Sequence, residues 1–177
     1  MALSKPVFLI GFMGSGKSTV GRTLSAHIGV PFTDLDDEVA KLHPQGIPGI
    51  FKDAGEDHFR KLEQIQLKNC ISTPAGIVAT GGGCPVFADN LHWMNETGTT
   101  VYIKCRPGIL FHRLAKEKNG RPLIKELNDL ELMETINSLL RSRHLVYEKA
   151  RIHVDGHKTI DEICHSIQQQ INGITNS

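Results

Sequence analysis

The sequence predicts an α/β fold in which helices cover both faces of a five-stranded parallel sheet. Five short apolar runs, of the kind expected for buried parallel strands, alternate with stretches of helical periodicity. Between the first run and the first helix, the segment Gly11–Ser18 reads GFMGSGKS and matches the phosphate-binding pattern G-x-x-x-x-G-K-[ST]. At 177 residues, the chain is expected to form one domain over 1–177.

The expected elements follow one another along the chain. We expect strands at Val7–Ile10, Pro31–Asp34, Gly76–Thr80, Thr99–Lys104 and Arg151–Val154. We expect helices at Lys17–Ile28, Asp36–Leu42, Glu56–Ile71, Pro107–Lys116, Asp129–Lys149 and Thr159–Asn172. Trp93 and Met94 are expected on a further helix, as packing residues. Because ligands bind at the carboxyl ends of the strands in such sheets, functional residues should follow each strand.

Composition limits the classes of partner. A net charge of +1 gives no electrostatic reason to expect binding to nucleic acid or to a membrane surface. The uncharged stretch 69–88 is interrupted by prolines and glycines, so it does not predict a membrane span. The four cysteines have no C-x-x-C spacing and suit free thiols in a reducing cytoplasm. No segment reads as a targeting signal, since the apolar N-terminal run is the expected first strand.

The phosphate-binding pattern lies between its expected strand and helix. Glycines allow backbone N–H groups to surround phosphates, and the helix N-terminus adds its positive dipole end. In such loops the lysine, here Lys17, reaches the β- and γ-phosphates, and the hydroxyl, here Ser18, ligates Mg²⁺. An incidental glycine-rich turn would match the pattern too, but the flanking strand and helix favour a nucleotide site.

Acidic residues follow the second expected strand. Asp36 could cap the next helix, and Asp37 and Glu38 could serve as first-turn carboxylates. Asp34 and Asp36 instead lie at a strand end facing the phosphate loop, which favours a role in the reaction over a purely structural one. One could hold Mg²⁺ or its water, and the other could accept a proton from a substrate hydroxyl.

A run of three glycines, Gly81–Gly83, follows the third expected strand. It could be only a flexible turn, but its place beside the phosphate loop suggests close approach of a ligand to the backbone. Further along, the loop 116–123 is dense in charge. It could be solvated surface, or a lid that brings an arginine to the transferred phosphoryl group.

The sequence leaves the binding partners of two arginines open. Arg143 lies between Leu139 and Tyr147 at i+4 spacing, so it points inward and needs an anionic partner. That partner could be a structural carboxylate or a carboxylate or phosphate of the substrate. Arg60 has Glu63 three residues later, and spacing alone does not separate an ordinary ion pair from a binding role.

Over essentially its whole length, the chain resembles the shikimate kinase family. The motifs that carry the resemblance are Gly11–Thr19, Asp34–Asp36, Gly55–Arg60, Gly81–Gly83, Arg121–Leu123 and Arg143–Tyr147. The phosphate loop alone is shared by many kinases, whereas the ordered combination is far more specific. The resemblance implies a nucleoside-monophosphate-kinase-like fold with a helical substrate-binding region at about 35–63 and a lid at about 114–126.

The resemblance also implies an activity, Mg²⁺-assisted transfer of a phosphoryl group from ATP to the 3-hydroxyl of shikimate, and roles for residues. The ATP site would comprise Gly14, Ser15, Gly16, Lys17, Ser18, Thr19 and the lid residue Arg121; Ser18 and Asp34 would serve the metal. In the shikimate site, Asp36 would be the base, and Arg60 and Arg143 would bind the carboxylate. The Gly82 backbone would bind ring hydroxyls. The other residues of this site would be Gly81, Gly83, Phe51 and Phe59. Lys17, Asp36 and Arg121 would be catalytic.

Some points stay open. Arg113 and Lys116 compete for the place of the basic residue that packs on adenine in the family. The segment 43–49, between the two expected substrate-region helices, is unusually rich in proline and glycine. A monomer is the default expectation. Rival functions are another small-molecule kinase of this fold, such as a gluconate kinase, or a non-catalytic nucleotide-binding module.

Overall fold

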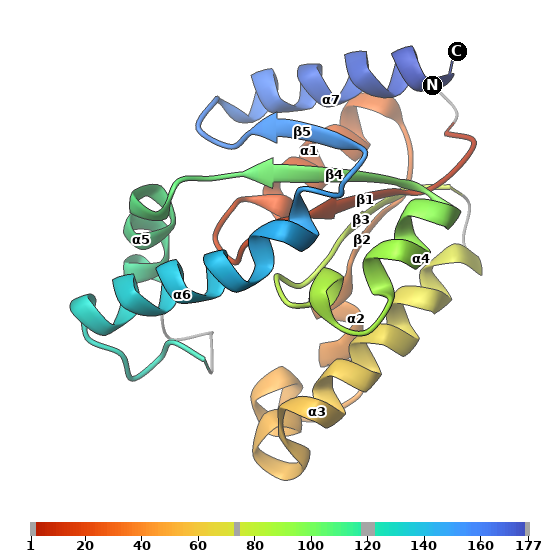
Figure 1. Cartoon of the computed structure of the whole chain (residues 1–177). Helices are drawn as coiled ribbons and strands as arrows, with labels where there is room; N and C mark the ends of the chain where they lie inside the picture. The colour runs from red at the N-terminus through yellow and green to blue at the C-terminus, as the bar shows by residue number, and fades with distance from the viewer. Residues whose placement is uncertain (1–2, 73–74, 118–122, 176–177) are drawn as a thin grey trace.

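Five parallel strands form one sheet in the computed structural model, which describes residues 3–72, 75–117 and 123–175 (Figure 1). The strands are β1 (Val7–Ile10), β2 (Phe32–Asp34), β3 (Ile77–Ala79), β4 (Thr99–Lys104) and β5 (Ile152–Asp155). Their order in the sheet is β2-β3-β1-β4-β5, and every neighbouring pair is parallel. The predicted five-stranded parallel sheet is therefore confirmed, with strand ends that differ by at most one residue.

Helices connect the strands. They are α1 (Lys17–Ile28), α2 (Leu35–Ala40), α3 (Gly46–Asn69), α4 (Asn90–Thr97), α5 (Pro107–Lys116), α6 (Asp129–Tyr147) and α7 (Ile160–Thr175), with short 3-10 turns η1 (Cys70–Ser72) and η2 (Cys84–Val86). The expected helix around Trp93 and Met94 is α4, and Met94 is fully buried. Within the described ranges, no helix combines the length and apolar character that a membrane crossing needs.

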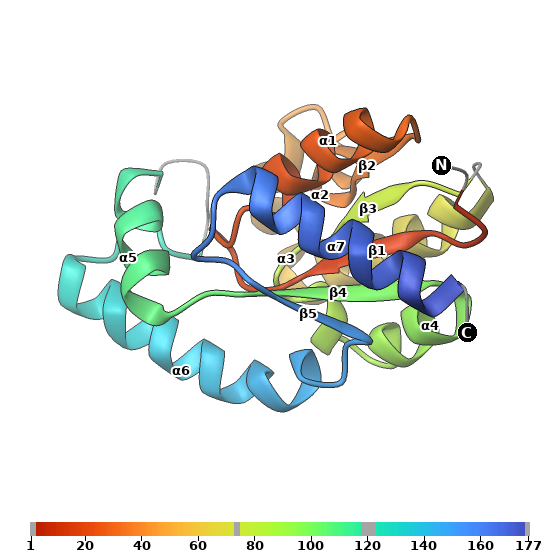
Figure 2. The same cartoon turned by 90° about the horizontal axis from the view of Figure 1, so that it is seen from above.

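The central strand β1 shows why the sheet is covered on both faces. All four of its residues are buried. Val7 and Leu9 belong to a hydrophobic cluster with residues of α1 and α7, while Phe8 and Ile10 belong to a second cluster with residues of α3, α4 and α6. Figures 1 and 2 show α1 and α7 on one side of the sheet and α4 on the other. A strand buried on both faces reads as a continuous apolar run, as the sequence indicated.

Three predicted helix starts are wrong: α7 begins at Ile160, one residue after the expected Thr159, and the other two concern α3 and α2. The helix expected from Glu56 begins at Gly46, and α3 continues across a kink at Gly55, where φ is 76° and ψ is 179°. Only glycine adopts such a backbone readily, so the chain joins two helical runs at this residue. The helix expected from Asp36 begins at Leu35, because Asp34 rather than Asp36 is its N-cap: the Asp34 carboxylate accepts a hydrogen bond from the Asp36 amide at 3.1 Å.

Candidate active site

The phosphate loop connects β1 to α1. Gly16 is the N-cap of α1 and has φ 92°, a conformation that favours glycine. Lys17 is buried, and its Nζ donates to the carbonyls of Gly11 at 3.0 Å and Phe12 at 2.8 Å. The loop's own carbonyls therefore fold the ammonium group back over the loop. A bound phosphate would offer this cation a stronger, charged acceptor.

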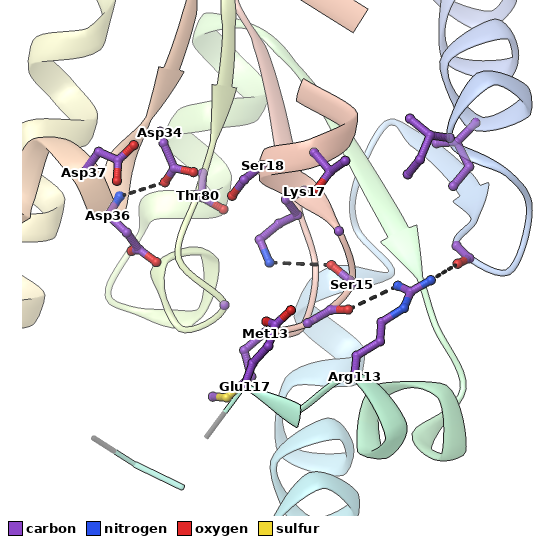
Figure 3. A pocket seen from close by; sticks show the side chains of 17 residues that line it. Met13, Ser15, Lys17, Ser18, Asp34, Asp36, Asp37, Thr80, Arg113 and Glu117 are labelled. Carbon is purple, nitrogen blue, oxygen red and sulfur yellow. Dashed lines mark hydrogen bonds between the residues drawn. The ribbon is translucent and has the colours of Figure 1, made fainter. Parts of the chain in front are cut away.

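A cavity of about 530 Å³ opens beside the loop (Figure 3). Every residue of this segment that was predicted to bind ATP lines the cavity: Gly14, Ser15, Gly16, Lys17, Ser18 and Thr19. Asp34 and Asp36, from the end of β2, and Thr80, from the end of β3, line the same cavity. The carboxyl ends of neighbouring parallel strands thus bring the predicted nucleotide and acidic residues together.

The predicted metal residues, Ser18 and Asp34, face this shared cavity and offer a hydroxyl and a carboxylate. Such hard oxygen donors fit Mg²⁺. Among the described residues, no group of three or more His, Cys, Asp or Glu side chains could hold a metal by itself. This donor set suits an ion that takes its other ligands from phosphates and water, as Mg²⁺ commonly does.

Arg113 reaches the far end of the same cavity. Its guanidinium donates to the carbonyl of Gly14 at 3.1 Å and to that of Gly156 at 3.4 Å (Figure 3). It thereby bridges the phosphate loop and the turn after β5, and Ile160 and Ile163 of α7 line the same cavity. Lys116, the competing basic residue, is not among the residues that line it. The geometry favours Arg113 for packing on a planar base.

A second cavity, of about 110 Å³, adjoins the first. Phe51 and Phe59, both from α3, line it and pack with ring centroids 4.8 Å apart. Arg60 and Arg143 line it as well. The remaining lining residues are Met13, Asp36, Ile47, Glu63, Gly81, Gly82, Gly83 and Leu123. The structure therefore brings every predicted acceptor-site residue to one small cavity with an apolar wall and two cations.

The cavities meet at three residues. Met13, Asp36 and Gly82 line both of them. Asp36 therefore lies where a group held in the larger cavity would adjoin a molecule held in the smaller one. Met13 was not singled out by sequence reasoning, because an x position of the loop pattern carries no chemical signal of its own.

The two inward arginines differ in their partners. Arg143 is 8% exposed, its guanidinium lies 5.7 Å from the centroid of the Phe12 ring, and its Nη1 has no hydrogen-bond partner among the described residues. Arg60 pairs with Glu63 at 2.8 Å and Glu56 at 3.0 Å. Burial lowers the pKa of Arg60, but these carboxylates outweigh it and raise that pKa. Arg60 thus takes part in a structural ion pair and also lines the smaller cavity.

Glu63 is the residue whose importance sequence reasoning missed. Its side chain is fully buried, and its Oε1 has no hydrogen-bond partner among the described residues. Burial raises the pKa of Glu63 to about 7, against the opposing charge of Arg60, and the nearby Asp36 raises it further. The i, i+3 spacing to Arg60 was the available signal, but it did not indicate burial.

A side chain at any of the three glycines would displace a neighbouring part of the site. A Cβ at Gly81 would lie 2.1 Å from Glu63 Oε1, and one at Gly83 would lie 2.4 Å from the Arg60 guanidinium. A Cβ at Gly82 would lie 2.9 Å from the Met13 amide nitrogen. These glycines therefore let the charged side chains and the phosphate loop pack directly against the backbone after β3.

The predicted lid arginine, Arg121, lies outside the described residues. The described residues on either side of that gap reach both cavities. Glu117 lines the larger one and Leu123 the smaller one.

Comparisons with known proteins point to one family. The family model described as shikimate kinase matches residues 13–172. A shikimate kinase of Phocaeicola vulgatus is 39% identical over 145 residues, covering 82% of this chain and 83% of that protein. Among solved structures, the shikimate kinase of Bacteroides thetaiotaomicron has a TM-score of 0.89 at 32% identity, covering 95% of this chain and 98% of that one.

A second solved structure, the shikimate kinase of Acinetobacter baumannii in complex with shikimate, has a TM-score of 0.88 at 30% identity and covers 96% of this chain and 93% of that one. A gluconokinase from Sinorhizobium meliloti has a TM-score of 0.68 at only 17% identity, which shows a shared fold alone. The Phocaeicola vulgatus relative and the two solved shikimate kinases each cover at least 82% of this chain. The chain belongs to the shikimate kinase family.

Proposed function

We propose that the chain transfers the γ-phosphoryl group of ATP to the 3-hydroxyl of shikimate. The observation that carries the proposal is the position of Asp36, which lines both the larger cavity and the smaller one. The family membership and a relative solved in complex with shikimate support the choice of acceptor.

The larger cavity holds ATP in this proposal. Backbone N–H groups of Gly14–Thr19 and the ammonium of Lys17 bind the phosphates, and Arg113 packs on the adenine. Ser18 and Asp34, which line this cavity, would hold Mg²⁺, and the ion would supply neutralisation of charge on the phosphates. Arg121 of the lid, at about 114–126, completes the charge stabilisation around the transferred group.

The smaller cavity holds shikimate, within a substrate-binding region at about 35–63. Arg60 and Arg143 bind the carboxylate, and the unpartnered, buried Nη1 of Arg143 is the group best suited to it. Phe51 and Phe59 flank the ring. The backbone of Gly82, between Gly81 and Gly83, binds the ring hydroxyls.

The chemistry relies on positioning. Asp36 accepts a hydrogen bond from the 3-hydroxyl and orients its oxygen towards the γ-phosphorus. It takes the proton as the new P–O bond forms and the bond from the γ-phosphorus to the bridging oxygen breaks, so that ADP leaves with that oxygen. Lys17 and Arg121 stabilise the charge on the phosphoryl oxygens. Closure of the lid excludes water, which would otherwise compete as acceptor. We further propose a cytoplasmic location, in keeping with the four free thiols. A monomer is the default proposal for one small domain.

Initial rates of ADP release with Mg²⁺-ATP test the choice of acceptor. We expect rapid release with shikimate and little with quinate, gluconate or nucleoside monophosphates. Preference for another acceptor would reassign Arg60 and Arg143 while leaving the nucleotide site in place. ATP binding without release for any acceptor would favour a non-catalytic nucleotide-binding module.

A further inference from the structure

Tyr147 is a buried polar residue to which the proposed reaction assigns no part. It ends α6, one turn after Arg143, and its side chain is fully buried. Its ring packs against Tyr102 of β4, with centroids 5.1 Å apart. An ordinary core position here would be filled by phenylalanine, since a buried hydroxyl is unfavourable unless it has a partner.

The partner of that hydroxyl is the site backbone. Tyr147 donates a hydrogen bond to the carbonyl of Gly82, 65 residues away in sequence. This bond fixes the plane of the peptide between Gly82 and Gly83, and both glycines line the acceptor cavity. Gly82 also packs closely on the phosphate loop, because a Cβ there would meet the Met13 amide at 2.9 Å. Tyr147 therefore holds the backbone at the junction of the two cavities.

Arg143 acts on the same hydroxyl. Burial raises the pKa of Tyr147 to about 12, although the neighbouring Arg143 opposes the shift. The hydroxyl consequently keeps its proton at working pH and remains a donor to Gly82. Arg143 lies one helical turn before Tyr147 on α6. One phenol thus lies between an arginine that lines the acceptor cavity and the backbone of the glycine turn.

We infer that Tyr147 is a positioning residue that couples the carboxylate-binding Arg143 to the Gly82 backbone, so that capture of the acceptor's carboxylate fixes the turn that orients its hydroxyls. The inference rests on the proposed acceptor site. It goes further by assigning a function to a side chain that lines neither cavity.

The test is steady-state kinetics of Tyr147→Phe beside the matched control Tyr102→Phe. Both changes remove one hydroxyl from the same buried ring pair, but only Tyr147 bonds to Gly82. Loss of one such bond should raise the KM for shikimate about 3- to 10-fold and lower kcat, with the KM for ATP nearly unchanged. Tyr102→Phe should leave all three constants near those of the wild type.

A residue that matters only for folding would give a different pattern. Tyr147→Phe would then lower the melting temperature and leave both KM values and kcat at wild-type levels, and that result would overturn the inference. If the wild type itself fails to phosphorylate shikimate, the proposed function fails instead, and the two failures are distinguishable.

If Tyr147→Phe does not fold, a spectroscopic measurement tests the coupling between Arg143 and Gly82 instead. The chain has two tyrosines, so Tyr102→Phe labelled with 3-fluorotyrosine carries a single fluorine probe, at Tyr147. We expect its ¹⁹F resonance to shift when shikimate saturates the protein, because the arginine beside the hydroxyl engages the carboxylate. An unchanged resonance at saturating shikimate, in protein that turns over, would contradict the coupling.

Discussion

At the scale of single residues, the proposed reaction asks most of Asp36. Its carboxylate belongs to both cavities, whereas the adjacent Asp37 lines only the larger one and pairs with Arg22 through exposed side chains at 3.3 Å. A general base must reach the hydroxyl that it deprotonates. Asp36 meets that requirement by position, and Asp37 provides a neighbouring carboxylate that does not.

We predict that Asp36→Asn lowers kcat by about 10²- to 10⁴-fold, because the amide orients the hydroxyl but cannot take its proton. ATP affinity, measured by calorimetry, should stay close to that of the wild type. Asp37→Asn is the control and should retain nearly full turnover. Near-normal kcat in Asp36→Asn would remove Asp36 from the role of base.

Glu63 makes stability depend on pH. Its pKa is about 7 in the folded protein and lies near 4.5 in the unfolded chain, so the folded state binds more protons between these values. The free energy of unfolding should therefore fall as the pH rises through this window. Relative to Glu63→Gln, which does not titrate, the wild type should lose about 2–3 kcal/mol between pH 5 and pH 8.

Urea denaturation of both proteins at pH 5 and pH 8 measures this difference. Glu63→Gln also weakens the pair with Arg60, but that offset is nearly the same at both pH values. A wild-type-to-variant difference that does not change with pH would show that Glu63 is already ionised at pH 5.

At the scale of elements, the kink in α3 positions the acceptor site. The run before Gly55 carries Phe51, the run after it carries Phe59 and Arg60, and the kink lets both runs contribute to one cavity. Eight residues of a straight helix would rise about 12 Å along its axis, whereas the rings of Phe51 and Phe59 have centroids 4.8 Å apart. The backbone of one glycine therefore shapes the apolar wall.

We predict that Gly55→Ala destabilises the protein by about 1–3 kcal/mol, because φ 76° with ψ 179° is strained for any residue with a Cβ. No atom lies within 4 Å of the added methyl group, so the cost is conformational. Gly108→Ala in α5 is the matched control: it also meets open space, and it should be neutral or stabilising by up to about 1 kcal/mol. Equal stability of both variants in urea would contradict the strain.

At the scale of the whole molecule, patterns in the sequence predicted the features that depend on residues close together in the chain. The apolar run of β1, the loop 11–18 and the inward direction of Arg143 follow from strand burial, glycine geometry and helix periodicity. The predicted site residues within the described ranges line two adjoining cavities. The parallel topology explains this, because it places the strand ends, and the loops after them, along one edge.

What the sequence did not predict depends on contacts between distant segments. Full burial of Glu63 requires the turn at Gly81 to pack against α3, and the bond from Tyr147 to Gly82 spans 65 residues. Helical spacing identified both side chains as neighbours of an arginine but could not show what lay opposite them. The predicted start of α3 was wrong because a glycine- and proline-rich segment has the composition of a loop. Only tertiary packing stabilises it as a helix.

The most direct test of the central claim is ³¹P NMR of the wild-type protein incubated with Mg²⁺-ATP and shikimate. We predict a new phosphomonoester resonance coupled to the ring proton at carbon 3, growing in step with ADP and growing at least about 100-fold more slowly with Asp36→Asn. Release of inorganic phosphate alone, or a phosphate ester at another ring position, would contradict the account of how the two cavities align donor and acceptor.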